Sequence, residues 1–421
     1  MSTIKLLPHQ QSVIEQTKEQ NKVAYYLDMG LGKTFVGSEK MKDLHARVNL
    51  VICQKSKVND WVEHFRKHYG LEQETFDLTN KGCFNLFLEE LEKGYPEKFN
   101  QRYVAVINYE LAFRRSELAN LKDFTLMLDE SSLIQNETAK RSKFILKKLS
   151  PNNVILLSGT PTSGKYERLW SQMNLLGWKI SKKMYYQQYV DIEFTDEGYP
   201  LIKGYKNVDR LKRKMREYGC VFMKSEEVLD LPQQNFIDIK LNVSKEYNKF
   251  IKNSIVRFDD VELVGDTTLT KLLYARQLCG QYSKEKLKAF KDLIDSTEDR
   301  LIVFYNFNDE LEKMQQLCED RHTSIVNGSV KDLHAYDNYD NSITFIQYQA
   351  GAMGLNLQKA NKIIYFTPTL SSELFEQSKK RIHRIGQERP CFYYQFKCGV
   401  EYKIYDTLSM RKDYTEFLFE E

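Results

Sequence analysis

The sequence lacks a long apolar run, because no window approaches the ~18 consecutive apolar residues that a membrane span needs. Its first residues, MSTIKLLPHQQ, do not combine a charged stretch with an apolar core, so no signal peptide is expected. The seven cysteines are scattered and none lies in a Cys-x-x-Cys pair, which gives zinc sites and disulfide frameworks little support. These absences favour a cytoplasmic protein with reduced cysteines and no membrane partner.

The chain also lacks an excess of one charge, since 62 Lys and Arg face 58 Asp and Glu, for a net charge of +4. That balance does not predict nucleic-acid binding, so any basic binding face must be local. Hydrophobic residues make up 42% and charged residues 29% of the 421 positions, which is a globular and not a disordered composition. This length predicts two or three domains.

Short apolar runs of strand length recur in two parts of the chain. They cover residues 23–27, 48–53, 103–108, 124–128 and 154–157 in the first part, and 301–305, 324–326, 342–346, 362–366 and 392–396 in the second. Continuous rather than alternating runs indicate strands buried on both faces, as in a parallel sheet covered by helices. The expected fold class is therefore α/β, with two tandem doubly wound parallel-sheet lobes.

The segment between these parts has a different composition. Residues 178–283 are rich in Tyr, Lys and Arg, and the stretches 185–190 and 209–218 have amphipathic helical spacing. We interpret the segment as a mainly helical insertion. The predicted domains are therefore a first lobe at 1–177, an insertion and connection at 178–283, and a second lobe at 284–421.

Residues 28–34, with the sequence DMGLGKT, follow an apolar run and precede a plausible helix. A glycine turn at a helix start directs backbone N–H groups at phosphate oxygens. Lys33 would neutralise β- and γ-phosphate charge, and Thr34 would hold Mg²⁺ through its hydroxyl. The strict GxxxxGK[ST] pattern is incomplete, because Leu27 stands where its first glycine belongs. An ordinary glycine turn that caps a helix is the alternative.

Another apolar run ends in the carboxylates of Asp129 and Glu130. An aspartate at the carboxyl end of a strand can reach the Mg²⁺ shell of a neighbouring phosphate loop. The adjacent glutamate could polarise the attacking water. A solvated acidic turn is the alternative, but the pair follows Lys33 and Thr34 in the order that a nucleotide site requires. We therefore favour the catalytic interpretation.

Residues 377–387, QSKKRIHRIGQ, place Arg381 and Arg384 three positions apart. On a helix, residues at this spacing share one face. Two such arginines could stabilise charge on a transferring γ-phosphoryl group. A solvated basic helix is the alternative interpretation.

Taken in order, these segments resemble the Swi/Snf-type ATPases of helicase superfamily two over nearly the full chain. Residues 28–34 look like the family's DEMGLGKT loop, residues 129–136 look like DEGHxIKN, and residues 383–387 read HRIGQ as in the family. Further resemblances join residues 7–10 to the family's adenine-contacting element, 51–61 to CPxSxxxNW, 107–110 to TYE, 157–161 with 169–170 to LTGTPxxNxxxELW, 222–228 with 231–232 to FMLRRxKxDV…LPPK, and 350–357 to AGGxGxNL.

Four positions depart from the family pattern. Ser132 replaces a histidine that helps to couple hydrolysis to DNA, and Lys380 replaces an aspartate before the first arginine. Gln349 replaces an arginine, and Ala352 replaces a glycine. These departures put coupling efficiency and DNA contacts in doubt, but they leave the ATPase residues in place.

The resemblance implies two RecA-like lobes that use ATP and Mg²⁺. The catalytic residues that it implies are Lys33, Asp129, Glu130, Arg381 and Arg384, with Thr34 and Asp129 as metal ligands. The nucleotide contacts that it implies are Gln10 (for adenine), Met29, Gly30, Leu31, Gly32, Lys33, Thr34, Gly354 and Asn356. The DNA contacts expected are Lys55, Ser56, Asn108, Tyr109, Asn306, Gln349 and Gly351. The coupling residues expected are Ser158, Thr160, Gln377, His383 and Gln387, and Trp61 is expected to pack in the interior.

The function predicted on this basis is that of an ATP-dependent double-stranded DNA translocase or remodelling ATPase, in which hydrolysis accompanies lobe closure. The protein would contact mainly the phosphates of the DNA, and such contacts carry no sequence information. The expected partners are double-stranded DNA and a DNA-bound protein that is displaced or recruited, and the expected state is a monomer. Little sequence flanks the motifs, so we expect a near-minimal motor from a prokaryotic host or phage-infected cell.

Two alternatives stay open at this point. A strand-separating DNA or RNA helicase would need a wedge hairpin, which residues 178–283 could hide. A nucleotide-gated DNA clamp with little hydrolysis would be favoured by the loss of Glu130, Arg381 or Arg384, and all three are present.

Overall fold

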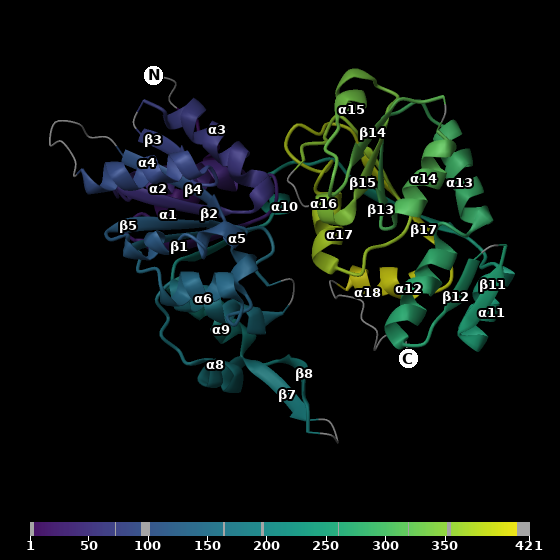
Figure 1. The fold of residues 1–421 in the computed structure, drawn as a ribbon, viewed down its shortest axis with the longest axis horizontal. Helices are drawn as coiled ribbons and strands as arrows, with labels where there is room; N and C mark the ends of the chain where they lie inside the picture. Colours follow the sequence, from purple (N-terminus) through teal and green to yellow (C-terminus); the bar gives the residue numbers. More distant parts are fainter. Residues whose placement is uncertain are drawn as a thin grey trace. The chain divides into compact units, whose positions relative to one another are not determined.

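The computed structural model describes residues 4–71, 73–93, 102–162, 165–194, 198–259, 261–318, 320–351 and 355–410. They belong to two compact units, unit 1 (Met1–Val228) and unit 2 (Leu229–Glu421). Each unit is built on one large sheet with helices on both of its faces (Figure 1). None of the helices in these described stretches has the length and apolar character needed to cross a bilayer.

Unit 1 contains a seven-stranded parallel sheet in the order β3-β4-β2-β5-β6-β1-β9. Its strands are β1 (Lys22–Leu27), β2 (Val48–Cys53), β3 (Gln73–Asp77), β4 (Arg102–Asn108), β5 (Phe124–Asp129), β6 (Asn153–Ser158) and β9 (Cys220–Met223). The central strands are buried at nearly every position, as continuous apolar runs predict for a sheet covered on both faces.

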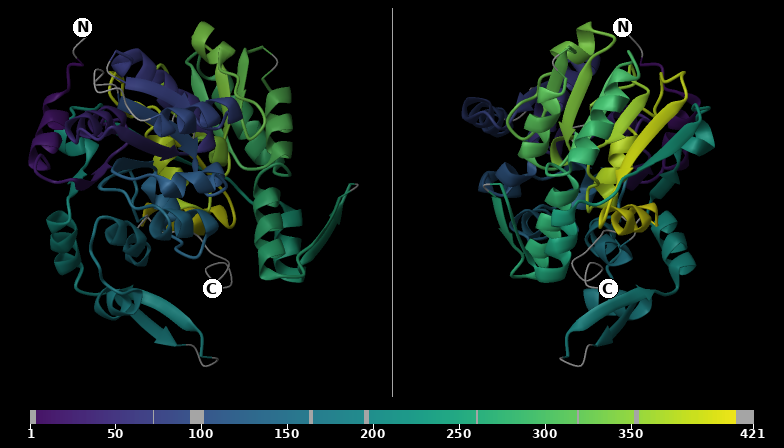
Figure 2. Two further views of the ribbon diagram at one scale, coloured as in Figure 1. Left: turned by 60° about the vertical axis from the view of Figure 1, so that its left-hand side comes forward. Right: turned by 90° about the vertical axis from the view of Figure 1, so that its right-hand side faces the viewer.

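The helices of unit 1 cover this sheet with amphipathic faces. They are α1 (Pro8–Gln16), α2 (Lys33–Asp43), α3 (Val58–Tyr69), α4 (Lys81–Glu92), α5 (Tyr109–Ala112), α6 (Lys140–Lys147), α7 (Trp170–Leu175), α8 (Lys182–Tyr189), α9 (Val208–Glu217) and α10 (Ser225–Val228). In α3, for example, Val58, Trp61, Val62 and Phe65 are buried at the spacing of one helix face. The hairpin of β7 (Val190–Phe194) and β8 (Pro200–Tyr205) projects from the rest of unit 1 (Figure 2).

Unit 2 contains a six-stranded parallel sheet in the order β10-β17-β16-β13-β15-β14. Its strands are β10 (Gln234–Lys240), β13 (Leu301–Tyr305), β14 (Thr323–Val326), β15 (Ile343–Gln347), β16 (Lys362–Tyr365) and β17 (Cys391–Lys397), with a separate hairpin of β11 (Ile255–Phe258) and β12 (Val261–Val264). Its helices are α11 (Lys245–Asn253), α12 (Thr268–Cys279), α13 (Lys284–Asp295), α14 (Asn308–Gln316), α15 (His334–Asn338), α16 (Tyr348–Gly351), α17 (Ser372–Lys379) and α18 (Glu401–Ser409). The two sheets confirm the expected α/β class with two doubly wound lobes.

The segment 178–283 does not form a third unit. The structure assigns residues 178–228 to unit 1 and residues 229–283 to unit 2. Strands accompany its helices, because β9 adds to the sheet of unit 1 beside β1, and β10 adds to the sheet of unit 2 beside β17. The segment therefore completes both sheets, whereas the domain boundaries drawn from the sequence stay a prediction.

Candidate active site

Three neighbouring strands of unit 1 end at the same edge of its sheet. The strands β5, β6 and β1 lie side by side and run parallel. Asp129 ends β5, Ser158 ends β6, and the glycine loop follows β1 directly. Because ligands of open α/β sheets bind outside the carboxyl ends of the strands, this edge is the candidate site in unit 1.

The glycine loop reaches α2 through left-handed backbone. Gly30 has φ of 91° and Gly32 has φ of 76°, which side chains with a Cβ rarely adopt. A Cβ on Gly32 would also lie only 2.1 Å from Nε2 of Gln10. The helix begins at Lys33, immediately after this turn. The loop therefore leads straight into a helix N-terminus, the geometry that favours an anion.

The side chain of Lys33 makes hydrogen bonds to the start of its own glycine loop. Its Nζ donates to the carbonyl oxygens of Leu27 at 2.9 Å and Asp28 at 3.3 Å. A Cβ on Gly159, just past β6, would lie 3.4 Å from this Nζ. The positive charge of Lys33 also lowers the pKa of Asp129. The ammonium group therefore lies among the ends of all three strands.

The carboxylate of Asp129 is held by the indole of Trp61. Nε1 of Trp61 donates to Oδ2 of Asp129 at 2.9 Å. Burial raises the pKa of Asp129, and this outweighs the opposing effects of the indole N–H and of Lys33. A half-buried carboxylate of this kind favours a cation beside it. With the hydroxyl of Thr34 at the start of α2, it supplies the hard oxygen donors that suit Mg²⁺.

Glu130 occupies a strained backbone position. Its φ of 52° and ψ of 59° are left-handed, a conformation that costs free energy for a residue other than glycine. The hydroxyl of Tyr109 supports the turn, because it donates to the carbonyl oxygen of Asp129 at 2.9 Å. Backbone strain of this kind is typical of functional sites, where the surrounding structure holds it in place. The turn sends Glu130 out of the line of β5.

A buried amide connects the three strand ends. The side-chain oxygen of Gln172, in α7, accepts from the hydroxyl of Tyr26 at 3.0 Å and from that of Ser131 at 2.7 Å. Its Nε2 donates to the carbonyl oxygen of Pro161 at 3.1 Å. Sequence reasoning missed Gln172 and gave Trp61 only a packing role. No sequence signal marked Gln172, because Ser171 and Asn174 are also polar within the same short helix.

The adenine candidate Gln10 braces the glycine loop. Its Oε1 accepts from the backbone N–H of Leu7 at 2.9 Å, and its Nε2 donates to the carbonyl oxygen of Leu31 at 3.1 Å. The side chain of Leu31 is buried, so a nucleotide would meet its backbone. Met29 is half-buried beside the loop. A contact between Gln10 and adenine stays a prediction.

The residues proposed to contact DNA differ in exposure. Lys55 and Ser56 are exposed on a short 3₁₀ turn after β2. Asn108 is buried and donates to Glu110 at 3.0 Å. Tyr109 is fully buried, and its hydroxyl is occupied by the turn after β5. This side chain supports the Asp129 turn from within, and the DNA contact expected of Tyr109 stays a prediction.

The coupling candidates of unit 1 lie beside the same strand ends. Ser158 is buried, and its Oγ accepts from the backbone N–H of Thr160 at 3.2 Å. This hydrogen bond shapes the turn that leads from β6 to Pro161. Gln172 donates a hydrogen bond to the carbonyl oxygen of Pro161 at the end of that turn. Gln172 therefore connects this turn to the turn after Asp129, so a change in the conformation of one turn would alter the other.

In unit 2, the arginines do not lie on a common helix face. The helix α17 ends at Lys379, and Arg381 and Arg384 follow in turns. Arg381 is almost completely buried, whereas Arg384 is half-buried and donates weakly to the carbonyl oxygen of Leu355 at 3.4 Å. Burial lowers the pKa of Arg384. The predicted shared helix face is therefore corrected.

Hydrogen bonds of Gln387 hold the turns that follow α17. Nε2 of Gln387 donates to the carbonyl oxygens of Gln358 at 3.1 Å, Ala360 at 2.7 Å and Ile382 at 3.3 Å. Gly386 just before it has φ of 91°, which turns the chain away from helical geometry. Gln387 therefore fixes the arginine-bearing turns in place.

The other predicted residues of unit 2 also make local contacts. His383 Nε2 lies 3.0 Å from the carbonyl oxygen of Pro232, and Gln377 donates to Glu373 at 3.2 Å. The amide of Asn306 donates to Thr367 Oγ1 at 2.8 Å, so it is already engaged within the fold. Gln349 and Asn356 are exposed, and Gly351 ends α16. Gly354 and Ala352 lie outside the described residues.

Two family models match the chain, and the first of them extends from unit 1 into unit 2. The family model of the SNF2-related domain matches residues 13–288, and that of the helicase conserved C-terminal domain matches residues 285–386. The chain is 22% identical to the ISWI chromatin-remodeling complex ATPase ISW1 of Saccharomyces cerevisiae, over 88% of this chain and 36% of that protein. It is 23% identical to an uncharacterized ATP-dependent helicase of Mycoplasma genitalium, over 87% of this chain and 37% of that protein.

A third relative is the DNA repair and recombination protein RAD54 of Saccharomyces cerevisiae, 24% identical over 94% of this chain and 53% of that protein. Among solved structures, the Sulfolobus solfataricus SWI2/SNF2 ATPase core in complex with dsDNA is 20% identical, with a TM-score of 0.45 over 97% of this chain and 91% of that one. The chain spans little more than a third of the length of the first relatives that it matches. The SNF2-related model covers well over half of the sequence, and the chain therefore belongs to the SNF2-related family of helicase-type ATPases.

Proposed function

We propose that this chain couples ATP hydrolysis to movement along double-stranded DNA. The observation that carries the proposal is the gathering of Lys33, Asp129 and the strained Glu130 at adjoining strand ends in a chain of the SNF2-related family. Relatives named for chromatin remodelling and for DNA repair support DNA as the polymer.

The chemistry assigned to unit 1 uses its own side chains. Lys33 binds the β- and γ-phosphates, and Thr34 with Asp129 holds Mg²⁺. Bound Mg²⁺ would neutralise phosphate charge. Glu130 accepts the proton of the attacking water, for which it must be ionised. Trp61 orients the Asp129 carboxylate through its indole N–H.

Unit 2 supplies positive charge in the proposed mechanism. Arg384 is half-buried and is the better candidate for contact with the γ-phosphate, whereas Arg381 is buried and supports the turn. In this proposal the two units approach on binding ATP, and each hydrolysis step releases them. Repeated approach and release would move the duplex.

The DNA grip is assigned to exposed side chains at loop positions. Lys55 and Ser56 in unit 1 and Gln349 in unit 2 are exposed and suited to phosphate contacts. Such contacts fix register without reading sequence, and their affinity falls steeply with salt.

The test is the rate of ATP hydrolysis with no polymer, single-stranded DNA, double-stranded DNA and RNA in parallel. We expect double-stranded DNA to stimulate most, with a steep fall as salt rises. Lys33→Ala, which removes the charge at the phosphates, is the inactive control. Equal stimulation by single strands would favour the strand-separating helicase, and ATP binding without turnover would favour the clamp.

A further inference from the structure

Two cysteines far apart in sequence meet in the interior of unit 2. Cys279 is the last residue of α12, and Cys398 follows β17. Each thiol points at the other's backbone: Sγ of Cys279 lies 3.4 Å from the carbonyl oxygen of Cys398, and Sγ of Cys398 lies 3.7 Å from that of Cys279. Both are buried. The two sulfurs and a carboxylate oxygen of Glu401 all lie within 4.8 Å of one another.

A buried ion pair adjoins the thiols. Nζ of Lys286 donates to Oε1 of Glu401 at 2.6 Å and to Oε2 at 2.5 Å, and neither side chain is exposed. Oε2 of Glu401 also accepts from the backbone N–H of Cys398 at 3.1 Å. The ammonium group therefore places a fixed positive charge near the sulfur of Cys398.

The pKa of Cys398 differs in this setting from the pKa of other buried cysteines. The hydrogen bond from the Cys279 thiol, followed by the charge of Lys286, lowers the pKa of Cys398 to about 6. Burial instead raises the pKa of Cys391 to about 11 and that of Cys318 to about 12. Burial also raises the pKa of Cys279. Cys398 is therefore the more acidic thiol of the pair and the better nucleophile, and its Sγ lies 3.6 Å from Oε2 of Glu401.

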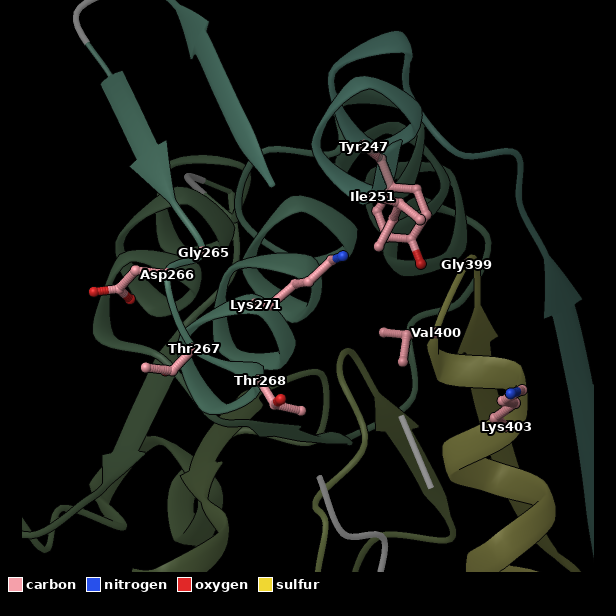
Figure 3. Close-up of a pocket in the computed structure, with 10 residues that line it drawn as sticks. All are labelled: Tyr247, Ile251, Gly265, Asp266, Thr267, Thr268, Lys271, Gly399, Val400 and Lys403. Carbon is pink, nitrogen blue, oxygen red and sulfur yellow. The ribbon is translucent and has the colours of Figure 1, made fainter. Parts of the chain in front are cut away.

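Unit 2 also holds a cavity of about 850 Å³ (Figure 3). Gly399 and Val400, which directly follow Cys398, line it together with Tyr247, Lys271 and Lys403. In Figure 3, Tyr247 and Lys271 extend into the space beside Gly399, whereas Asp266 points away. A Cβ on Gly399 would lie 2.5 Å from Cζ of Tyr247, so the ring of Tyr247 packs directly against this glycine.

We propose that Cys279 and Cys398 form an oxidation site, at which a hydroperoxide that enters through this cavity produces a reversible intramolecular disulfide. The thiolate of Cys398 attacks the peroxide, so that an S–O bond forms, the O–O bond breaks and the leaving oxygen takes a proton to become an alcohol or water. Cys279 then attacks the sulfenic sulfur, and an S–S bond forms as water leaves with its proton. Two thiols are oxidised and one peroxide is reduced.

The geometry suits this product better than a metal. The sulfurs need only close from within 4.8 Å to the ~2 Å of a disulfide bond. Two thiols and a carboxylate are also donors for zinc, but a cation would have to displace the ammonium of Lys286 from Glu401. The inference is independent of the proposed function.

The test treats the full chain with hydrogen peroxide and follows intact mass and alkylated peptides. We expect a loss of two hydrogen atoms, a peptide that links Cys279 to Cys398, and recovery with a dithiol reductant. Cys279→Ser should stop at a sulfenic acid on Cys398, which a cyclic dione reagent traps. Cys398→Ser should not react at the peroxide dose that converts the native chain.

Cys391→Ser is the matched control, because it removes a buried cysteine of the same unit that lies outside the pair, and it should oxidise like the native chain. Lys286→Met should slow oxidation about tenfold or more if the ammonium favours the thiolate. If Lys286→Met does not fold, trapping of the sulfenic acid on Cys398 in Cys279→Ser still tests the proposal. Oxidation of Cys83 alone with the pair untouched, or stoichiometric zinc with unreactive thiols, would overturn the proposal.

Discussion

The two units place their polar residues in different ways. In unit 1, Lys33, Asp129 and Glu130 stand half-buried at strand ends, where a ligand can reach them. In unit 2, the motif residues Arg381 and Gln387 are buried, and Gln387 holds three carbonyl groups of the fold. The sequence motifs therefore fall on half-buried strand ends in unit 1 and partly on buried turns in unit 2, and burial is the difference between them.

The largest effect is expected where the scaffold of unit 2 presents Arg384. If this side chain meets the γ-phosphate, Arg384→Ala should lower turnover by about 10³-fold or more while ATP binding is kept. Arg384→Lys keeps the charge but loses the planar fork, so it should also be slow. Arg389→Ala, at an exposed arginine five residues on, is the control. Turnover near the native rate in both Arg384 variants would make the arginine turns purely structural.

The next effect belongs to the strand-end site of unit 1. Glu130→Gln should lower turnover by about 10²–10⁴-fold, because an amide cannot accept the proton of water. Binding of ATP, measured by equilibrium titration, should be little changed. Glu110→Gln replaces an exposed carboxylate of the same unit and should leave turnover unchanged. Normal turnover in Glu130→Gln would remove the catalytic base from our mechanism.

The interior of unit 2 should respond in stability. Lys286→Met leaves the Glu401 carboxylate buried and unpaired, which should lower the free energy of unfolding by about 3–5 kcal/mol. The double variant Lys286→Met with Glu401→Leu should recover most of that loss. Lys291→Met, at an exposed ion pair, should cost below about 1 kcal/mol in the same denaturant titration. An equal loss of stability in Lys286→Met and Lys291→Met would mean that burial does not determine how much these ion pairs stabilise the fold.

A smaller effect is expected for the indole that holds Asp129. Trp61→Phe keeps the ring but loses a hydrogen bond to a charged group, worth about 1.5–3 kcal/mol. Because this N–H lowers the pKa of Asp129, its loss raises that pKa further. The acid limb of the pH–rate profile should therefore move to higher pH, and more Mg²⁺ should be needed. Trp170→Phe, whose indole donates to a backbone carbonyl, should leave the acid limb in place.

The smallest effect is a gain in stability, which we expect on replacing Asp129. The pKa of Asp129 is raised above its unfolded value, so the ionised carboxylate destabilises the fold at neutral pH. That cost is absent below the unfolded pKa and appears as pH rises through the folded one. Asp129→Asn should therefore raise stability by about 0.5–2 kcal/mol while it abolishes turnover. A stability gain that persists at a pH where Asp129 is protonated would contradict this cause.

Most of the sheet could be predicted from the sequence. The apolar runs match β1, β2, β4, β5 and β6 in unit 1 and β13 to β17 in unit 2, because strands buried on both faces need continuous apolar residues. The edge strand β10 carries no such run, because it has mostly exposed or half-buried positions within a polar stretch. Its strand conformation depends on β17, about 150 residues later in the chain.

The site was predictable where it follows strand ends and not where it depends on tertiary contacts. Asp129 and Glu130 could be found because they terminate an apolar run. Trp61 and Gln172 could not, because their partners come from other elements. The end of α17 at Lys379 was missed as well, because the contacts that Gln387 makes in the following turns come from residues outside the helix.

The pairing of β1 with β9 has a consequence for how the chain is made. Ala24 of β1 pairs with Cys220 of β9, and in unit 2 Gln234 of β10 pairs with Cys391 of β17. At about 5–20 residues per second, a ribosome needs roughly 10–40 s to reach β9 after it has made β1. During this time one edge of β1, the strand that carries the glycine loop, is open to pairing with another chain. We therefore expect the yield of unit 1 to depend on protection of the nascent chain over this interval as well as on the stability of the finished sheet.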